Sequence, residues 1–224
     1  EMFFLWQPCC RSSLFGKPEK SVTEDSRASL EEEQSASQPG HACICVQNVR
    51  KAYGGADVIQ GWNESYEAGK IYYFSTPSGS GKTTRLRLLA DIEKPEEGSI
   101  QMEGMKSGSI SMVFQEDRLC EDYSAVKNVE LVTGDEEAAR EQLSRLLPRE
   151  ALDKPCRQLS GGMRRRVALV RAMMARSQFC LLDEPFNGLD AENRQRAMEY
   201  IAEEGRGRGI LIASHDDVEI DYGR

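Results

Sequence analysis

Residues 71–84 read IYYFSTPSGSGKTT and join an apolar run, a glycine-rich loop and the start of a helix. The run Ile71–Ser75 has the length and composition of a buried strand, and a helix is predicted over residues 82–90. A Gly-Lys-Thr sequence between a strand and a helix is the context of a phosphate-binding loop of the Walker A type. This stretch therefore predicts an α/β fold that carries a phosphate-binding loop.

The loop, residues 76–84, places backbone N–H groups and a helix N-terminus where they can contact phosphate oxygens. We expect the Lys82 ammonium at the β- and γ-phosphates and the Thr83 hydroxyl on Mg²⁺. The alternative, a glycine-rich turn without a ligand, does not account for the Gly-Lys-Thr sequence. The residues expected to contact the nucleotide here are Ser78, Gly79, Ser80, Gly81, Lys82, Thr83 and Thr84.

Two residues depart from what such a loop and helix favour. Thr76 stands where the phosphate-loop pattern has glycine, and a Cβ there costs about 1–3 kcal/mol if the backbone needs a positive φ. Asp91 falls where helix 82–90 should end, a position that favours glycine and disfavours an anion. Both departures keep open the alternative of a chain that binds nucleotide weakly.

Strands and helices alternate along the rest of the chain, which implies a largely parallel sheet with ligands at the carboxyl ends of its strands. Further strands are predicted at residues 43–49, 110–114, 179–182 and 210–213. One helical face, in residues 136–147, is formed by Ala139, Leu143, Leu146 and Leu147. A second helical face, after a glycine pair, is formed by Met163, Val167, Val170 and Met174.

The overall composition excludes some functions. With 29 basic and 37 acidic residues among 224, the net charge of −8 argues against a general nucleic-acid binder. Seven cysteines without a C-x-x-C pair, and only two histidines, argue against a zinc site and suit a reducing cytosol. Cys43 and Cys45 share one face of a predicted strand, where we expect small buried thiols.

Residues 1–41 are expected to lie outside the ordered domain, which is predicted to cover residues 42–224. Within them, residues 16–41 lack aromatic side chains and are rich in Ser, Glu and Lys, so they predict a flexible linker. No apolar run approaches the roughly 18–20 residues that span a bilayer. Because the chain starts at Glu1, a longer upstream segment stays open as an alternative to a short apolar tail.

Three further motifs follow the phosphate loop in a fixed order. They are Leu159-Ser160-Gly161-Gly162-Met163, Leu181-Leu182-Asp183-Glu184-Pro185 and a lone His215. Together the four resemble the ATP-binding subunit of an ABC transporter, over about residues 46–216. Residues 113–119, VFQEDRL, are similar to the Q-loop of the bacterial importers for nitrate, sulfonate and taurine. The resemblance implies a P-loop NTPase of ABC type, with a mostly parallel sheet, an N-terminal antiparallel β element and a small helical subdomain near residues 116–176.

The resemblance also implies contacts with a bound Mg²⁺·ATP. Tyr53 corresponds to the aromatic residue that stacks on adenine, and an ordinary turn tyrosine is the alternative. Gln115 corresponds to the Q-loop glutamine that senses Mg²⁺ and the attacking water. His215, directly after an apolar strand, corresponds to the histidine that contacts the γ-phosphate.

Asp183 and Glu184 end the Walker B strand, and two adjacent carboxylates can divide metal binding from water activation. Asp183 is expected to hold Mg²⁺ and Glu184 to act as the general base. The catalytic residues implied are therefore Lys82, Gln115, Glu184 and His215. The metal ligands implied are Thr83, Gln115 and Asp183.

A serine hydroxyl and two glycine amides at a helix start form an anion site. By resemblance, Ser160, Gly161 and Gly162 serve the ATP of the opposite subunit, and Asp190 touches that subunit, so function implies a head-to-tail pair. The three arginines at residues 164–166 are expected to form a solvated helix face. The middle arginine departs from the glutamine that the family often has there.

The resemblance implies an ATPase that powers a membrane transporter, with import favoured by the Q-loop. Its partners are a transmembrane permease, a second copy or a paralogous ATPase and, for an importer, an extracytoplasmic substrate-binding protein, without nucleic acid. It would act at the cytoplasmic face of the membrane. The alternatives are a weakened or regulatory cassette and an ABC protein outside transport. Only nine residues follow His215, where the family normally continues, so a minimal and a truncated cassette are both open.

Overall fold

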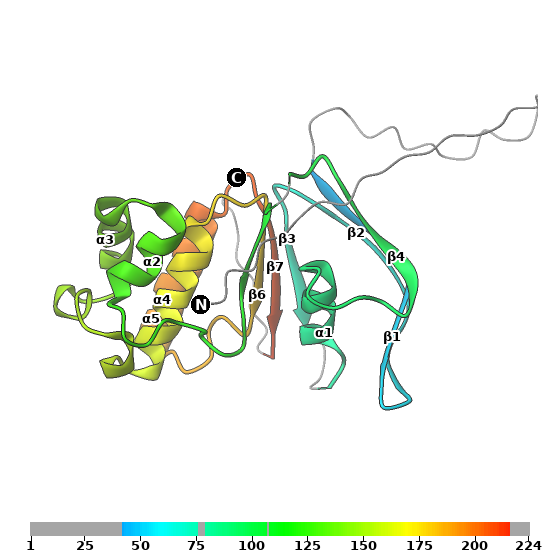
Figure 1. Ribbon diagram of the computed structural model, residues 1–224, viewed down its shortest axis with the longest axis horizontal. Coiled ribbons are helices and arrows are strands. Elements are labelled where there is room, and N and C mark those ends of the chain that lie inside the picture. Colours follow the sequence, from blue (N-terminus) through cyan, green and yellow to red (C-terminus); the bar gives the residue numbers. More distant parts are fainter. Residues whose placement is uncertain (1–41, 76–78, 107, 216–224) are drawn as a thin grey trace, which may run out of the picture. The chain divides into compact units, whose positions relative to one another are not determined.

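The computed structural model describes residues 42–75, 79–106 and 108–215 (Figure 1). Short apolar runs form the centre of a parallel sheet in the order β3-β7-β6-β5, as expected for strands that are buried on both faces. Its strands are β3 (Ile71–Ser75), β7 (Gly209–Ser214), β6 (Phe179–Asp183) and β5 (Ile110–Val113). All six residues of β7 and all five of β6 are buried.

A separate antiparallel sheet has the order β2-β1-β4, and its strands are β2 (Ala56–Glu67), β1 (Cys43–Tyr53) and β4 (Glu97–Glu103). Ile44 and Val46 point into the core, so the alternation along β1 leaves Cys43 and Cys45 half-buried on the other face. The expectation of buried thiols was therefore wrong. Partial burial and the neighbouring thiol still raise the pKa of Cys43 to about 11.

Helix α1 (Lys82–Leu89) lies between the two sheets (Figure 1). Leu86 and Leu89 are fully buried in a cluster with residues of the antiparallel sheet and with Leu181 and Leu211 of the parallel sheet. The helix ends at Leu89 with Ala90 as its C-cap, one residue short of the predicted range 82–90. Asp91, just after its last residues, has φ 58° and a backbone N–H that bonds to the carbonyl of Leu88.

The remaining helices cover the opposite face of the parallel sheet (Figure 1). They are α2 (Ala125–Thr133), α3 (Glu136–Ser144), α4 (Gly161–Met174) and α5 (Ala191–Glu204), with single 3₁₀ turns at Arg149–Ala151 and Cys156–Gln158. The apolar face predicted for residues 136–147 is buried, although α3 stops at Ser144 and its last two leucines follow in a turn. Buried Asn128 ties α2 to the loop before it, since its side chain accepts from the Cys120 N–H and donates to the Cys120 and Ser124 carbonyls.

Helix α4 is buried on most sides, not only along the predicted face. Arg165 is 3% exposed and Arg166 is 7% exposed, so the expected solvated arginine face was wrong for two of its three members. Their guanidinium groups donate to backbone carbonyls of neighbouring elements, which compensates for lost hydration. Arg164 alone keeps a substantially exposed side chain, at 38%.

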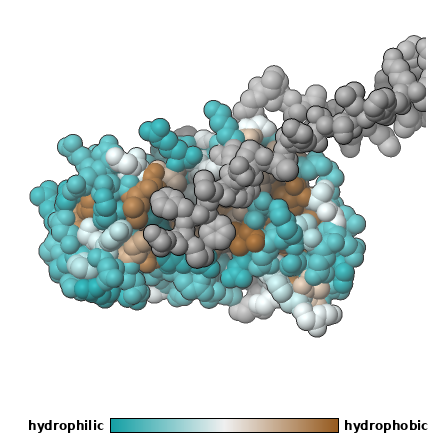
Figure 2. Space-filling model, in the orientation of Figure 1, coloured by the Kyte–Doolittle hydropathy of each residue, from teal (hydrophilic) through white to brown (hydrophobic). Residues whose placement is uncertain are grey.

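The predicted fold class is confirmed: a parallel sheet, an antiparallel sheet formed mainly by the N-terminal strands, and a group of helices. Hydrophilic side chains cover most of the described surface in the view of Figure 2. Among the residues that the structure describes, no helix combines the length and the apolar character that a membrane crossing demands.

Candidate functional site

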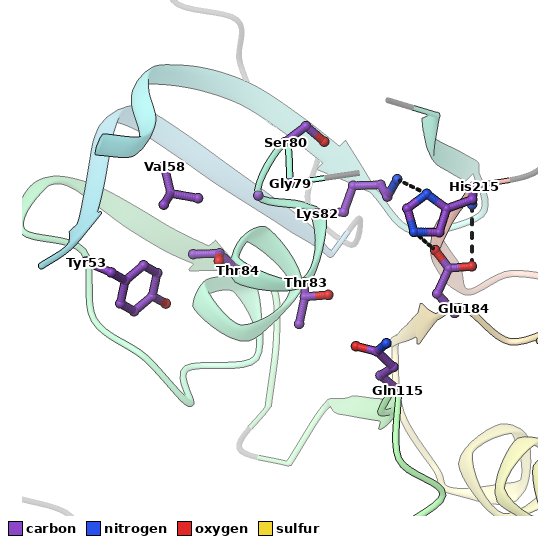
Figure 3. Close-up of a pocket in the computed structure, with 11 residues that line it drawn as sticks. Tyr53, Val58, Gly79, Ser80, Lys82, Thr83, Thr84, Gln115, Glu184 and His215 are labelled. Atoms are coloured by element: carbon purple, nitrogen blue, oxygen red, sulfur yellow. Dashed lines mark hydrogen bonds and ion pairs between the residues drawn. The ribbon is translucent and has the colours of Figure 1, made fainter. Parts of the chain in front are cut away.

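A cleft of about 330 Å³ opens at the carboxyl ends of the parallel strands, where α/β sheets bind ligands (Figure 3). The cleft contains most of the described residues that the sequence predicted for the site. Its lining consists of Tyr53, Val58, Gly79, Ser80, Gly81, Lys82, Thr83, Thr84, Gln115, Glu184 and His215. Thr76 and Ser78, also named by the sequence, lie outside the described residues.

The N-terminus of α1 faces this cleft and is suited to an anion. Gly81 is the N-cap residue, with φ 81° and no side chain to accept from the first-turn N–H groups, and the first turn holds no acidic residue. A Cβ at Gly81 would come within 2.9 Å of Val58, so only glycine fits against β2 there. The first-turn N–H groups, which the glycine N-cap cannot satisfy with a side chain, and the positive end of the helix dipole are a physical basis for phosphate binding.

Lys82, His215 and Glu184 form a chain of contacts across the cleft (Figure 3). Nζ of Lys82 lies 3.2 Å from Nδ1 of His215, and Nε2 of His215 lies 3.2 Å from Oε1 of Glu184. An ammonium can only donate, so Nδ1 accepts and the ring proton stands on Nε2, toward the carboxylate. Lys82 is buried although it is cationic, so its charge interacts mainly with groups inside the cleft.

Glu184 has an unusual backbone for a residue with a side chain. Its φ is 49°, in the left-handed region, at a cost of order 1–3 kcal/mol for a residue other than glycine. Its N–H bonds to the Ala213 carbonyl at 2.8 Å, which completes the last residue pair of β6 with β7, Asp183 with Ala213. The left-handed turn follows directly on Asp183, so the two adjacent carboxylates leave β6 at different orientations.

The residues present fit a hard divalent cation. Asp183 is 2% exposed, and its Oδ2 atom has no hydrogen-bond partner among the described residues. Burial raises the pKa of the Asp183 carboxyl, against the opposing effect of a hydrogen bond from the Thr83 side chain. An orphaned buried carboxylate oxygen beside a threonine hydroxyl, with the Gln115 amide on the cleft wall, is an oxygen donor set of the kind that Mg²⁺ prefers.

Tyr53 and Val58 stand at the other side of the cleft, beyond the start of α1 (Figure 3). The Tyr53 ring is 45% exposed, its hydroxyl donates to Glu93, and Nζ of Lys51 lies 5.4 Å from its centroid. Burial, then the Glu93 contact, raises the pKa of Tyr53. Val58 and Glu93 were missed by sequence reasoning, because a valine in a strand and a glutamate in a loop carry no signal of their own.

Ser160, Gly161, Gly162 and Asp190 are not among the residues that line the cleft. Ser160 is the N-cap of α4 and accepts from the Met163 N–H at 3.2 Å. Asp190 is the N-cap of α5, and its hydrogen bonds from Asn193 lower its pKa. The two helix starts lie together, since a Cβ on Gly162 would approach the Gly188 carbonyl to 3.0 Å.

Comparison with protein families places residues 59–187, more than half of the chain, in the ABC transporter family. Aliphatic sulfonates import ATP-binding protein SsuB 2 of Agrobacterium fabrum is 34% identical over 190 residues, 81% of this chain and 73% of that protein. The related SsuB 1 of Rhodococcus jostii is 39% identical over 174 residues, 73% of this chain and 69% of that protein. Sulfate/thiosulfate import ATP-binding protein CysA 2 of Rhizobium meliloti is 33% identical over 197 residues, 79% of this chain but 54% of that protein.

Solved structures give the same result. The ATP-binding cassette MJ0796, solved as a dimer in a post-hydrolysis state with ADP and Pi, superposes with a TM-score of 0.69 at 26% identity, over 77% of this chain and 88% of that one. A dimeric structure of the same cassette gives a TM-score of 0.65 at 27% identity, over 77% of this chain and 88% of that one. The chain belongs to the ABC transporter family, as an ATP-binding and ATP-hydrolysing subunit related to sulfonate importers.

Proposed function

We propose that this ATPase binds Mg²⁺·ATP in the cleft and hydrolyses it as one half of a head-to-tail pair that drives import through a membrane permease. The observation that carries the proposal is the convergence of Lys82, Glu184 and His215 on one cleft, at the N-terminus of a helix whose N-cap is glycine. These groups supply a cation for phosphate, a carboxylate for water and a polar link between them.

In this proposal the residues of the cleft divide the chemistry. The α1 N–H groups and Lys82 hold the phosphates, and Tyr53 stacks on the adenine. Glu184 accepts a proton from the water that attacks the γ-phosphate in line, and His215 orients that carboxylate through Nε2. Catalysis of this kind is mostly positioning and charge stabilisation, because little covalent chemistry falls to the protein.

Mg²⁺, when bound, neutralises charge on the β- and γ-phosphates. Asp183, Thr83 and Gln115 are the residues that would hold it. The buried Oδ2 of Asp183, which has no hydrogen-bond partner among the described residues, supports this assignment, since a bound cation would compensate it.

The signature residues are proposed to complete the site of a second chain. Ser160, Gly161 and Gly162 begin α4 outside the cleft, and Asp190 begins α5 beside them. A dimeric relative of known structure supports a paired assembly. The second chain is an identical copy or a paralogue.

The membrane partners are proposed from the relatives, which are import ATP-binding proteins. A permease would contact the helical subdomain, residues 116–176 of the ATPase domain 42–224, at the cytoplasmic face of the membrane. A substrate-binding protein on the other side of the membrane would deliver the cargo. The cargo itself is selected by those partners, and the names of the relatives make a sulfur-containing oxyanion the first class to test.

The experiment that tests the proposal is size-exclusion chromatography of the Glu184→Gln variant with and without Mg²⁺·ATP. We expect turnover to disappear, nucleotide binding to persist and ATP to shift the chain from monomer to dimer. As a control, Glu184→Gln with Ser160→Ala is expected to bind nucleotide at one chain's cleft and to dimerise less. Hydrolysis at the wild-type rate by Glu184→Gln would overturn the assignment of the base, and absence of nucleotide binding would favour a weakened cassette.

A further inference from the structure

The side chain of Arg165 contacts the two segments that carry the proposed catalytic residues Glu184 and Gln115. It lies in the first half of α4, four residues after the signature glycine Gly161, and its side chain is 4% exposed. Its guanidinium is directed at the carboxyl ends of two neighbouring strands of the parallel sheet, β5 and β6.

At the end of β6, the guanidinium holds the backbone on which the proposed base stands. Nε and Nη2 donate to the Glu184 carbonyl at 3.1 and 2.6 Å, and Nη2 also donates to the Asp183 carbonyl. This is the residue pair at which the chain turns into the left-handed region, with φ 49° at Glu184. A strained conformation persists only where its surroundings fix it, and Arg165 supplies contacts of that kind.

At the end of β5, the same guanidinium holds the segment that carries Gln115. Nη1 donates to the Phe114 carbonyl at 2.5 Å, to the Gln115 carbonyl at 3.3 Å and to Asp117 Oδ1 at 3.2 Å. The planar, five-donor guanidinium suits such a junction, because it can bridge several acceptors in fixed directions. A lysine ammonium is a point charge on a flexible stem, so it cannot hold both strand ends in the same geometry.

We infer that Arg165 is a positioning residue for hydrolysis, which fixes Glu184 and Gln115 relative to each other and to the helix that starts at the signature residues. This inference rests on the proposed roles of Glu184 and Gln115. The guanidinium acts through the backbone of both residues, and Arg165 is not among the residues that line the cleft. The start of α4, which is proposed to serve the second chain's nucleotide, is thereby tied to the base of its own chain.

The test is Arg165→Met, which keeps an unbranched apolar stem and a similar helix propensity while it removes all five donors. We expect kcat for ATP hydrolysis, per folded chain, to fall about 10- to 100-fold, the range that follows from a misplaced catalytic group. The Kd for ATP, measured with Glu184→Gln in the background, is expected to change less than about threefold, because phosphate and adenine contacts lie elsewhere. Arg165→Lys is expected to recover only part of kcat.

Arg208, the residue before β7, offers a matched control, because its guanidinium contacts the other end of α4 and Ser111 of β5. Its guanidinium donates to the Met173 carbonyl at 2.6 Å, to Ser111 Oγ at 3.1 Å and to Ser177. Arg208→Met is therefore expected to lower the melting temperature and to leave kcat per folded chain within about twofold of the wild type. Equal losses of kcat in both variants, or an unchanged kcat in Arg165→Met, would overturn the positioning role. Absence of ATPase activity in the wild type would instead overturn the proposed function.

Discussion

Nε2 of His215 lies 3.2 Å from Oε1 of Glu184, at the far end of a ring whose Nδ1 faces Lys82. The backbone N–H of His215 also lies 3.4 Å from the second carboxylate oxygen of Glu184. The histidine thus meets both oxygens of the proposed base, and it can fix the carboxylate plane without taking part in proton transfer. This relationship predicts how the cleft responds to removal of the ring.

His215→Ala is expected to lower kcat about 100-fold, the magnitude typical of a lost acid–base or orienting contact. The Kd for ATP, titrated in the Glu184→Gln background, is expected to change far less, because Lys82 and the α1 N-terminus remain. His215→Gln keeps one polar group beside Glu184, so its kcat should lie between those of the wild type and His215→Ala. A loss of affinity that matches the loss of kcat would show that His215 contributes to ground-state binding instead.

Asp183→Asn is expected to abolish Mg²⁺-dependent hydrolysis and yet to raise the melting temperature at pH 7 in metal-free buffer. Burial raises the pKa of the Asp183 carboxyl in the folded protein above its unfolded value. The stability that this shift contributes to the folded state is present at low pH and is lost as pH rises through the folded pKa. At pH 7 the ionised carboxylate therefore destabilises the folded protein, and a neutral amide removes that cost.

Differential scanning fluorimetry as a function of pH checks the sign for Asp183. The stability advantage of Asp183→Asn should shrink as pH falls, since protonation then neutralises the wild-type side chain as well. Added Mg²⁺·ATP should stabilise the wild type more than the variant, because binding to the folded state raises its stability. A variant that is less stable than wild type at pH 7 without Mg²⁺ contradicts the prediction.

Tyr53→Ala is expected to weaken ATP binding by about 1–3 kcal/mol, or about 5- to 150-fold in Kd, because an aromatic face under the base is lost. Tyr53→Phe retains the ring and loses the hydroxyl contacts to Glu93 and Thr84, so its Kd should stay within about threefold. Isothermal titration of both variants in the Glu184→Gln background measures the difference. Equal ATP affinities for the wild type, Tyr53→Ala and Tyr53→Phe would show that Tyr53 has only a structural role in the β1–β2 turn.

Asp91→Gly is expected to stabilise the protein by about 1 kcal/mol, because φ is 58° at this position and glycine adopts it without strain. The ion pair of Asp91 with Lys94 is lost, but both side chains are largely exposed and such pairs contribute little. The melting temperature should rise about 2–4 °C for a domain of this size. Lys94→Ala is the matched control, with little expected change; a lower melting temperature for Asp91→Gly would refute the strain argument.

The strands and the phosphate loop could be predicted because their signals are local. Apolar runs such as Ile71–Ser75 are long enough for one buried strand, and glycine marks the turn that follows. The sequence could not say which face of β1 is buried from the cysteines alone. The neighbouring Ile44 and Val46 are more apolar than the cysteines and are buried in the core. A comparison of the two faces of the strand would therefore have predicted which face is buried.

The buried arginines on α4 show a limit of a different kind. A run of charges at residues 164–166 is usually solvated, and only tertiary structure reveals that Arg165 meets five acceptors from two segments, residues 114–117 and 183–184. Its departure from the glutamine common at this position was visible in the sequence, but its contacts were not. Similarly, the motifs identify Ser160 and Asp190, while the structure assigns both to helix caps.

The separation of Ser160 from the cleft has a genetic consequence. If each active site takes its phosphate loop from one chain and its signature serine from the other, a chain defective in Lys82 still offers an intact Ser160, and the reverse holds for a chain defective in Ser160. Mixing the two inactive chains then restores one complete site in each mixed pair. A null allele at Lys82 and a null allele at Ser160 would therefore complement each other. Either allele alone would not show that the site is shared between two chains.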